Sequence, residues 1–453
     1  MSSENQHQAP HDAEEAPFLP PRITRRNIAL SAANQFFVEA GMTLSEGTTV
    51  LPLLVKALGG SNFLAGLLPS LRWFGWLAPQ FLAAGRMQRL TYFVPIVQKL
   101  ELVRCIGYLL LGILTVLLGP SRPGLMLAIF VVLFMLTRIA AGSSAVARTE
   151  VVARIVPQEE RATVISTRRV TGGVAGLLAG FVVGYVLNER VSQFPVNYGL
   201  LLGLSGISFG LAIVVFSGIV ERQLPIKPRQ IDMLQQIRRT PALLRADRRY
   251  AMYISVRAAA SGLNLAAPFY ILYATEALGV PAAMAGIYIT LRTATQVLSN
   301  MFWGGQCRRR GSLWVLQLAL ALGVTAPLSV VALAIVGPHL WPEGAPAILG
   351  WAFSLVFLMQ GLSASGESLS ELTYLYEIAP EEERPTYYGL INTVLGPLYF
   401  LPAVAGAMLD LVGFIPIFSA AALFISIAYI LAVRMNAHEQ KRAHPAGRAI
   451  QSQ

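Results

Sequence analysis

The segment LAGLLPSLRWFG (64–75) carries Arg72 in the middle of an apolar run, and MAGIYITLRTAT (284–295) repeats the arrangement with Arg292. A charged side chain at the centre of a membrane helix costs about 2.5–3.5 kcal/mol on insertion scales. Two arginines in matching contexts, 220 residues apart, indicate a duplicated chain in which both serve a purpose.

A second pair of segments supports the duplication. IVPQEERATVIS (155–166) and IAPEEERPTYYG (378–389) share six identities in twelve positions at an offset of 223. A repeat of this kind predicts two similar halves. With six spans in each half, both halves face the same way across the membrane, which is the parallel-repeat arrangement.

The composition is that of an all-α integral membrane protein. Of the 453 residues, 55% are hydrophobic and 13% charged, whereas a soluble chain carries about 25% charged residues. Apolar runs of about 20 residues are long enough to cross a hydrocarbon core of ~30 Å, and their continuity argues against a β-barrel. We expect twelve transmembrane helices in two pseudo-symmetric six-helix bundles, starting near Asn27, Ser61, Tyr92, Leu125, Ala162, Tyr198, Tyr250, Ala282, Ser312, Ala347, Thr386 and Gly413.

The distribution of Lys and Arg predicts the orientation. The net charge is +11, yet only Lys56, Arg122 and Arg190 fall in loops on the side opposite the termini. By the positive-inside rule, both termini are cytoplasmic and the chain is a multi-pass protein of the inner (plasma) membrane. The excess of Lys and Arg thus reflects the orientation of the chain in the membrane and its attraction to anionic lipid, and no nucleic-acid partner is expected.

The polarity of the remaining segments divides the chain. Residues 1–26 and 435–453 are polar and are expected to be disordered cytoplasmic tails. Residues 27–220 and 250–434 form the two six-helix bundles, and the basic, proline-bearing segment 221–249 is a cytoplasmic linker.

Two inner loops then suggest a family. GGQCRRRG (304–311) and, more weakly, AGRMQRLT (84–91) follow the eighth and second spans. With the duplication and the long basic central loop, they make residues 27–434 resemble the major facilitator superfamily (MFS) of secondary transporters. Gly304, Arg309 and Gly311 fit the family's loop pattern, as does Arg89. Its acidic position is taken here by Arg308 and Gln88.

The resemblance implies a central cavity lined by the first, fourth, seventh and tenth spans, so polar residues near the membrane midplane are candidates for binding substrate. Counting 1.5 Å per residue along each span places six such side chains near the midplane: Glu39, Arg72, Arg138, Asn264, Arg292 and Gln360. The arginines outnumber the carboxylate. Buried charge is normally paired, and a guanidinium holds carboxylate or phosphate in a bidentate manner, so an anionic or zwitterionic solute is favoured.

Glu39 has two interpretations. It forms a structural ion pair with Arg72 or Arg138, or it accepts a proton, since desolvation favours a neutral carboxyl group and a neighbouring arginine favours the charged one. Glu39, Glu46 and Glu367 are the candidates for proton coupling. For Arg72 and Arg292, structural pairing and substrate contact both stay open.

A third group of residues is assigned to an inner gate. Arg257 lies about 10 Å into the seventh span by its helical rise, with Glu367 and Glu371 on the tenth span as candidate partners. Arg161 and Arg384 occupy equivalent positions in the two repeated loops. With Arg89 and Arg309, these residues complete the candidate gate.

A secondary transporter is therefore the expected function, moving a small organic solute by alternating access, coupled to H⁺ or Na⁺, as a monomer in lipid. Drug efflux is the alternative within the superfamily, and a lipid translocase or receptor is the alternative of another class. An enzyme is not expected, because the five histidines lie in tails or loops and no HExxH motif is present. No cofactor and no metal site are expected.

Overall fold

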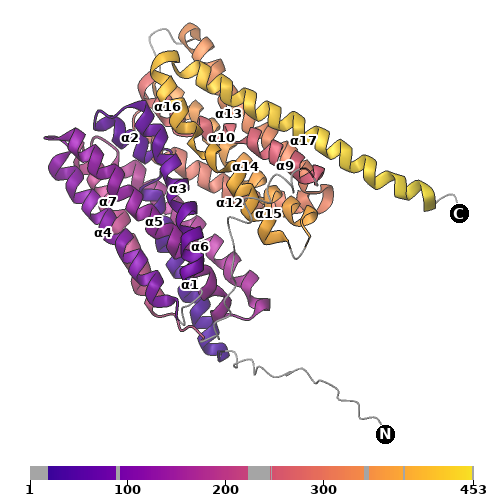
Figure 1. Cartoon of the computed structure of the whole chain (residues 1–453). Helices are drawn as coiled ribbons and strands as arrows, with labels where there is room; N and C mark the ends of the chain where they lie inside the picture. The colour runs from indigo at the N-terminus through magenta and orange to yellow at the C-terminus, as the bar shows by residue number, and fades with distance from the viewer. Residues whose placement is uncertain are drawn as a thin grey trace.

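The computed structural model describes residues 19–87, 92–222, 245, 247–340, 346–380 and 383–450, excluding the side chains of 78–87, 158, 338, 346, 385–386 and 441–450. Every secondary-structure element in these residues is helical (Figure 1). The prediction of an all-α chain is confirmed.

The described part of the first half contains six long helices, one short α-helix and one 3-10 turn. Three of the long helices have Pro at a first-turn position, where its missing N–H leaves no helical bond unmade. The half is built from α1 (Pro21–Leu44), α2 (Val50–Ala57), α3 (Asn62–Met87), α4 (Val94–Leu118), α5 (Pro123–Ile155), η1 (Gln158–Glu160), α6 (Arg161–Val186) and α7 (Val196–Ser217).

The second half repeats this plan with two broken spans. Pro268 interrupts the seventh expected span and Pro397 the eleventh, because proline lacks the N–H that an α-helix needs. The half is built from α9 (Arg248–Ala260), α10 (Gly262–Leu265), α11 (Phe269–Leu272), η2 (Tyr273–Ala277), α12 (Met284–Arg310), α13 (Ser312–Leu340), α14 (Pro346–Ile378), α15 (Arg384–Leu395), η3 (Gly396–Phe400), α16 (Leu401–Val412) and α17 (Phe414–Ile450).

Eight helical stretches of the described chain are long and apolar enough to cross a membrane. The helices α1, α3 and α12 have 24, 26 and 27 residues, so their length suffices at 1.5 Å per residue, but they carry polar and charged side chains. Glu39, Arg72 and Arg292, discussed below, lie on these three helices.

The two halves meet through equivalent pairs of helices. The second span of the first half, α3, packs on α16, which belongs to the eleventh span. The eighth span, α12, packs on the fifth span, α6. Glycines allow these contacts: a Cβ atom at Gly66 would overlap the carbonyl group of Pro402, and one at Gly286 would overlap the backbone of Gly184. The pairing of second with eleventh and eighth with fifth is what a pseudo-twofold axis requires.

The halves are joined on one side only. We call the side where α1 begins and α17 ends the terminal side, and the other, with α2 and the end of α16, the distal side (Figure 1). One hydrophobic cluster on the distal side contains residues of both halves, such as Leu54 and Phe269. On the terminal side each half has its own cluster, around Val151 in the first and Tyr374 in the second. The halves are therefore closed distally and separated towards the terminal side.

The Gly286 contact gives a first prediction. Gly→Ala normally favours a helix interior by up to ~1 kcal/mol, but at Gly286 the new methyl group meets the Gly184 backbone, and overpacking costs about 1–3 kcal/mol. Gly286→Ala should lower the thermal unfolding midpoint. Gly305→Ala on the same helix has open space at its Cβ position and should leave the midpoint unchanged or raise it; equal shifts in the two variants would contradict this packing.

The tails differ from the expectation of disorder. Helix α1 begins at Pro21, six residues before the predicted boundary, and Asn27 fixes it by donating to the Val220 carbonyl oxygen at 2.8 Å. Helix α17 continues to Ile450, through most of the tail predicted to be disordered. The reason is anchoring: Met435 is buried and Glu439 pairs with Arg249 at 2.6 Å. Residues 1–18, 451–453 and, in the linker, 223–244 and 246 lie outside the described residues.

Candidate functional site

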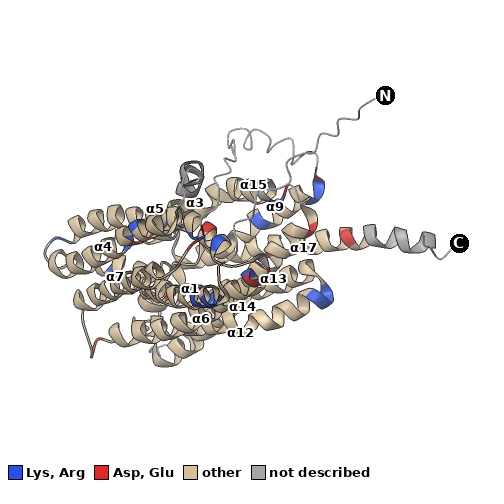
Figure 2. Cartoon of the chain, turned by 90° about the horizontal axis from the view of Figure 1, so that it is seen from below, with Lys and Arg blue, Asp and Glu red and all other residues tan. Residues whose placement is uncertain are grey.

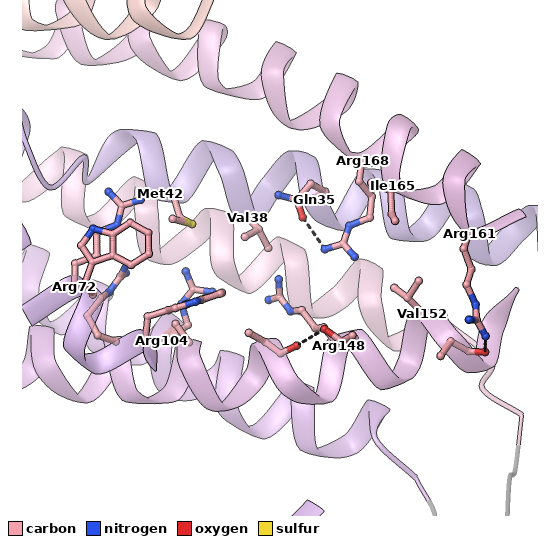
Figure 3. A pocket seen from close by; sticks show the side chains of 17 residues that line it. Gln35, Val38, Met42, Arg72, Arg104, Arg148, Val152, Arg161, Ile165 and Arg168 are labelled. Atoms are coloured by element: carbon pink, nitrogen blue, oxygen red, sulfur yellow. Dashed lines mark hydrogen bonds between the residues drawn. The ribbon is translucent and has the colours of Figure 1, made fainter. Parts of the chain in front are cut away.

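A cavity of about 690 Å³ lies within the first half. All 17 lining residues come from α1, α3, α4, α5 and α6, and Figure 3 shows them arranged from Arg72 at one end to Arg161 at the other. Arg161 is the first residue of α6 and so lies at the terminal side, whereas Arg72 lies deep, near the distal closure. The cavity thus extends towards the side on which the halves are separated.

Helix α5 forms the long wall of this cavity. Its lining positions run from Arg138 through Ala141, Ala145 and Arg148 to Ala153, which is about 22 Å of helix at 1.5 Å per residue. The alanines leave room beside the chain, and the arginines extend into it. The positions recur at helical spacing, so one face of α5 lines the space.

Arginine dominates the lining. Six of the 17 residues are arginines and none is Asp or Glu, and the polar remainder is one glutamine and one threonine. Figure 2 shows how rare charged positions are along the rest of the described ribbon. The arginines are Arg72, Arg104, Arg138, Arg148, Arg161 and Arg168.

Two of these arginines share one buried carboxylate. Glu101 lies 2.7 Å from Nη1 of Arg104 and 2.5 Å from Nη2 of Arg148. Its side chain is 2% exposed. Arg104 also stacks over the Phe209 ring at 3.9 Å and lines the cavity.

Three further arginines have no carboxylate within 4 Å in the described part of the chain. Arg138 donates to the Tyr108 hydroxyl at 2.5 Å, and Arg168 donates to Oε1 of Gln35 at 2.8 Å. Arg161 donates to a backbone carbonyl oxygen of α5. Neutral acceptors orient these guanidinium groups without cancelling their charge.

Glu46 joins the two pseudo-symmetric arginines of the duplicated segments. Its Oε1 atom lies 3.7 Å from Nη1 of Arg72 and 3.9 Å from Nη1 of Arg292. Oε2 accepts hydrogen bonds from the Thr48 backbone N–H at 2.7 Å and the Thr49 hydroxyl at 2.8 Å. Arg72 belongs to the first half and Arg292 to the second, so this carboxylate bridges the halves above the deep end of the cavity.

Glu39 does not form the ion pair that one interpretation gave it. Its carboxylate accepts a 3.4 Å hydrogen bond from Gln35, and no arginine of the described chain lies within 4 Å of it. Arg72 and Arg104 still act on it through charge at longer range. Arg72 finds its partner in Glu46 because the chain turns after α1 and carries that carboxylate back over α3.

Two further sets of contacts seal the distal side. Lys56 pairs with Glu276 at 3.0 Å, and Asn62 donates to Asp410 at 2.5 Å, each from one half to the other. Nearer the cavity, Trp73 stacks on Tyr399 with ring centroids 5.0 Å apart. The break at Gly396–Phe400 places this tyrosine against α3.

Among the candidate gate residues, Arg257 and Arg161 form ion pairs and hydrogen bonds within their own halves. Arg257 pairs with Glu367 at 2.6 Å and Glu371 at 2.9 Å, both within the second half. Arg161 bonds within the first half, Arg309 is exposed and Arg384 lies over the Tyr376 ring. Arg89 lies outside the described residues.

The structure thus separates the candidate binding residues into two groups. Arg72 and Arg138 line the cavity, whereas Asn264, Arg292 and Gln360 belong to the second half and are not among its lining residues. Sequence reasoning missed Arg148 and Arg168 as candidates for the site. The spacing of Arg161 and Arg168, seven residues apart on one face of α6, was the available signal.

Comparison with known proteins agrees with this architecture. Residues 252–452 match the family model described as Major Facilitator Superfamily. The structure of a peptide transporter POT mutant is similar with a TM-score of 0.70 at 12% identity, covering 94% of this chain and 99% of that one. The nucleoside transporter NupG, also as a mutant, gives 0.66 at 12% identity, covering 92% and 99%.

The second half of the chain thus matches the major facilitator superfamily by sequence, and the whole chain shares its fold with these transporters. A bacterial homologue of the iron transporter ferroportin, in an inward-facing state, is similar with a TM-score of 0.61 at 15% identity, covering 91% and 98%. Identities this low establish the shared fold alone. No curated protein matches the chain, so its cargo has to be argued from its own cavity.

Proposed function

We propose that this MFS protein is a secondary active transporter of a small organic anion. The observation that carries the proposal is the cavity lined by six arginines and no acidic residue. Of the six, Arg72, Arg104 and Arg148 have Glu46 or Glu101 within 4 Å, whereas Arg138, Arg161 and Arg168 have neutral acceptors. Uncompensated buried charge is costly, and an anion bound in the cavity lowers that cost.

Alternating access follows from the way the halves are joined. An anion enters from the terminal side, where the halves are separated, and reaches the arginines of the first half. Rocking of the halves about the bound solute then opens the distal contacts and closes the terminal ones. In that second state Arg257, Arg161 and Arg384 are the charged groups available to close the terminal side.

Glu39 is the carboxyl group best suited to proton coupling. Glu46 and Glu367 each have an arginine within 4 Å, whereas Glu39 has a glutamine. Protonation of Glu39 therefore disrupts no ion pair within 4 Å in the described chain, unlike protonation of Glu46 or Glu367. We place the terminal side in the cytoplasm and take the transport unit to be one chain, because each chain holds both halves.

The test is thermal stabilisation of the detergent-purified protein by organic anions, zwitterions, sugars and lipophilic cations, at pH 6 and pH 8. We expect an anion to raise the unfolding midpoint, and Arg138→Gln to abolish that rise. Arg190→Gln, an exposed change outside the cavity, is the control. A response to lipophilic cations alone would contradict the proposal and favour drug efflux. A stabilising anion would next be tested for uptake into proteoliposomes.

A further inference from the structure

We infer that the cargo is an elongated anion with at least two negatively charged groups separated by an apolar body. This inference rests on the proposed function, since it names the class of anion that the same cavity would carry. It is drawn from where the arginines lie along the cavity rather than from their number.

The arginines are spread along the cavity instead of converging on one point. Arg138 and Arg148 lie ten residues apart on α5, which is about 15 Å along the helix, and Arg161 and Arg168 are separated by about 10 Å on α6. Figure 3 shows Arg72, Arg104, Arg148, Arg168 and Arg161 following one another along the space. A single carboxylate reaches one level of this series and leaves the others without a counter-charge.

The positions of the protein's own carboxylates indicate that a bound anion supplies negative charge at two levels along the cavity. At the deep end Arg72 has Glu46, and on the α4–α5 wall Arg104 shares Glu101 with Arg148. Arg138 and Arg168 have only neutral acceptors in the described chain, the Tyr108 hydroxyl and the Gln35 amide oxygen. These two arginines, one on each of two walls, are the groups for which a bound anion supplies the missing charge.

Apolar side chains also line the cavity, alongside the arginines. Val38, Met42, Trp76, Val152 and Ile165 all line the cavity. They fit a hydrocarbon or aromatic body, and the volume of about 690 Å³ is within the usual range for small-molecule sites. A compact inorganic anion would leave this apolar surface unfilled.

The experiment compares straight-chain dicarboxylates of four to ten carbons with monocarboxylates of the same length, by isothermal titration of the purified protein. We expect at least tenfold tighter binding of the best dicarboxylate than of its monocarboxylate, with an optimum chain length. A phosphomonoester series tests two charges placed at one point. Equal affinity of mono- and dicarboxylates, or tightest binding of the shortest dianion or of the phosphomonoesters, would overturn the inference while leaving anion transport intact.

Two variants distinguish failure of the elongated-cargo inference from failure of the proposed anion transport. Arg168→Gln should reduce dicarboxylate affinity to the monocarboxylate level and change monocarboxylate affinity by no more than about twofold. Arg190→Gln should change neither. Absence of binding by every anion, with the protein folded by its unfolding midpoint, would reject the proposed function itself. An equal loss for both classes in Arg168→Gln would show a single charged level and reject the elongated cargo.

Discussion

Replacing Glu101 with Gln should destabilise the first half more than other single changes in its polar interior. The substitution leaves Arg104 and Arg148, both close to this buried carboxylate, without their shared anionic partner. Removing one member of a buried ion pair typically costs about 3–5 kcal/mol, and here two cations lose it together. Thermal or denaturant unfolding in detergent measures the loss.

Two comparisons make this prediction specific. Glu439→Gln removes the partner of Arg249 at the terminal end of α17, where the side chains are 21% and 38% exposed, so its cost should be ~1 kcal/mol or less. An anion that occupies the cavity should restore part of the stability lost in Glu101→Gln, because it returns negative charge near both arginines. A loss no larger than that of Glu439→Gln would contradict the assigned role.

Replacing Glu46 with Gln should open the distal side. The change removes the carboxylate that pairs with both Arg72 of the first half and Arg292 of the second. Each of these ion pairs is long and partly exposed and is worth about 1 kcal/mol or less, so losing both together should shift the ratio of distally closed to distally open protein by up to about tenfold. Spin labels at Arg122 and Leu411, both exposed, report the distance across this side in a Cys105→Ser, Cys307→Ser background.

The control is the other ion pair between the halves. Glu276→Gln breaks the ion pair with Lys56. The side chains of Glu276 and Lys56 are 35% and 29% exposed, so the change should alter the distances between the spin labels little. If Glu46→Gln and wild type gave the same distance distribution while both stayed folded, Glu46 would not be the group that holds the distal side closed.

Periodicity and duplication were enough to predict the fold. Long apolar runs fix where helices lie, and the matching contexts of Arg72 and Arg292 fix the relation of the halves. The ends of α1 and α17 were missed because single anchoring contacts, such as that of Glu439 with Arg249, extend a helix beyond its apolar run. The breaks at Pro268 and Pro397 follow from proline chemistry.

The site was only partly predictable for a different reason. Helical spacing indicates which residues share a face, but it does not say which faces meet. Arg104 shares Glu101 with Arg148 because α4 packs on α5. Arg72 pairs with Glu46 instead of Glu39 because the chain turns after α1 and returns over α3. The placement of the cavity within the first half depends on the same packing.

The central claim is that arginines of the first half hold an anionic cargo. It is tested most directly by titrating the best anion of the panel into wild type, Arg138→Gln, Arg292→Gln and Arg190→Gln. The account predicts at least tenfold weaker binding in Arg138→Gln, because a charged partner is lost from the cavity wall, and less than about threefold change in the other two. Unchanged affinity in Arg138→Gln, with binding lost in Arg292→Gln, would contradict it and move the cargo to the interface between the halves.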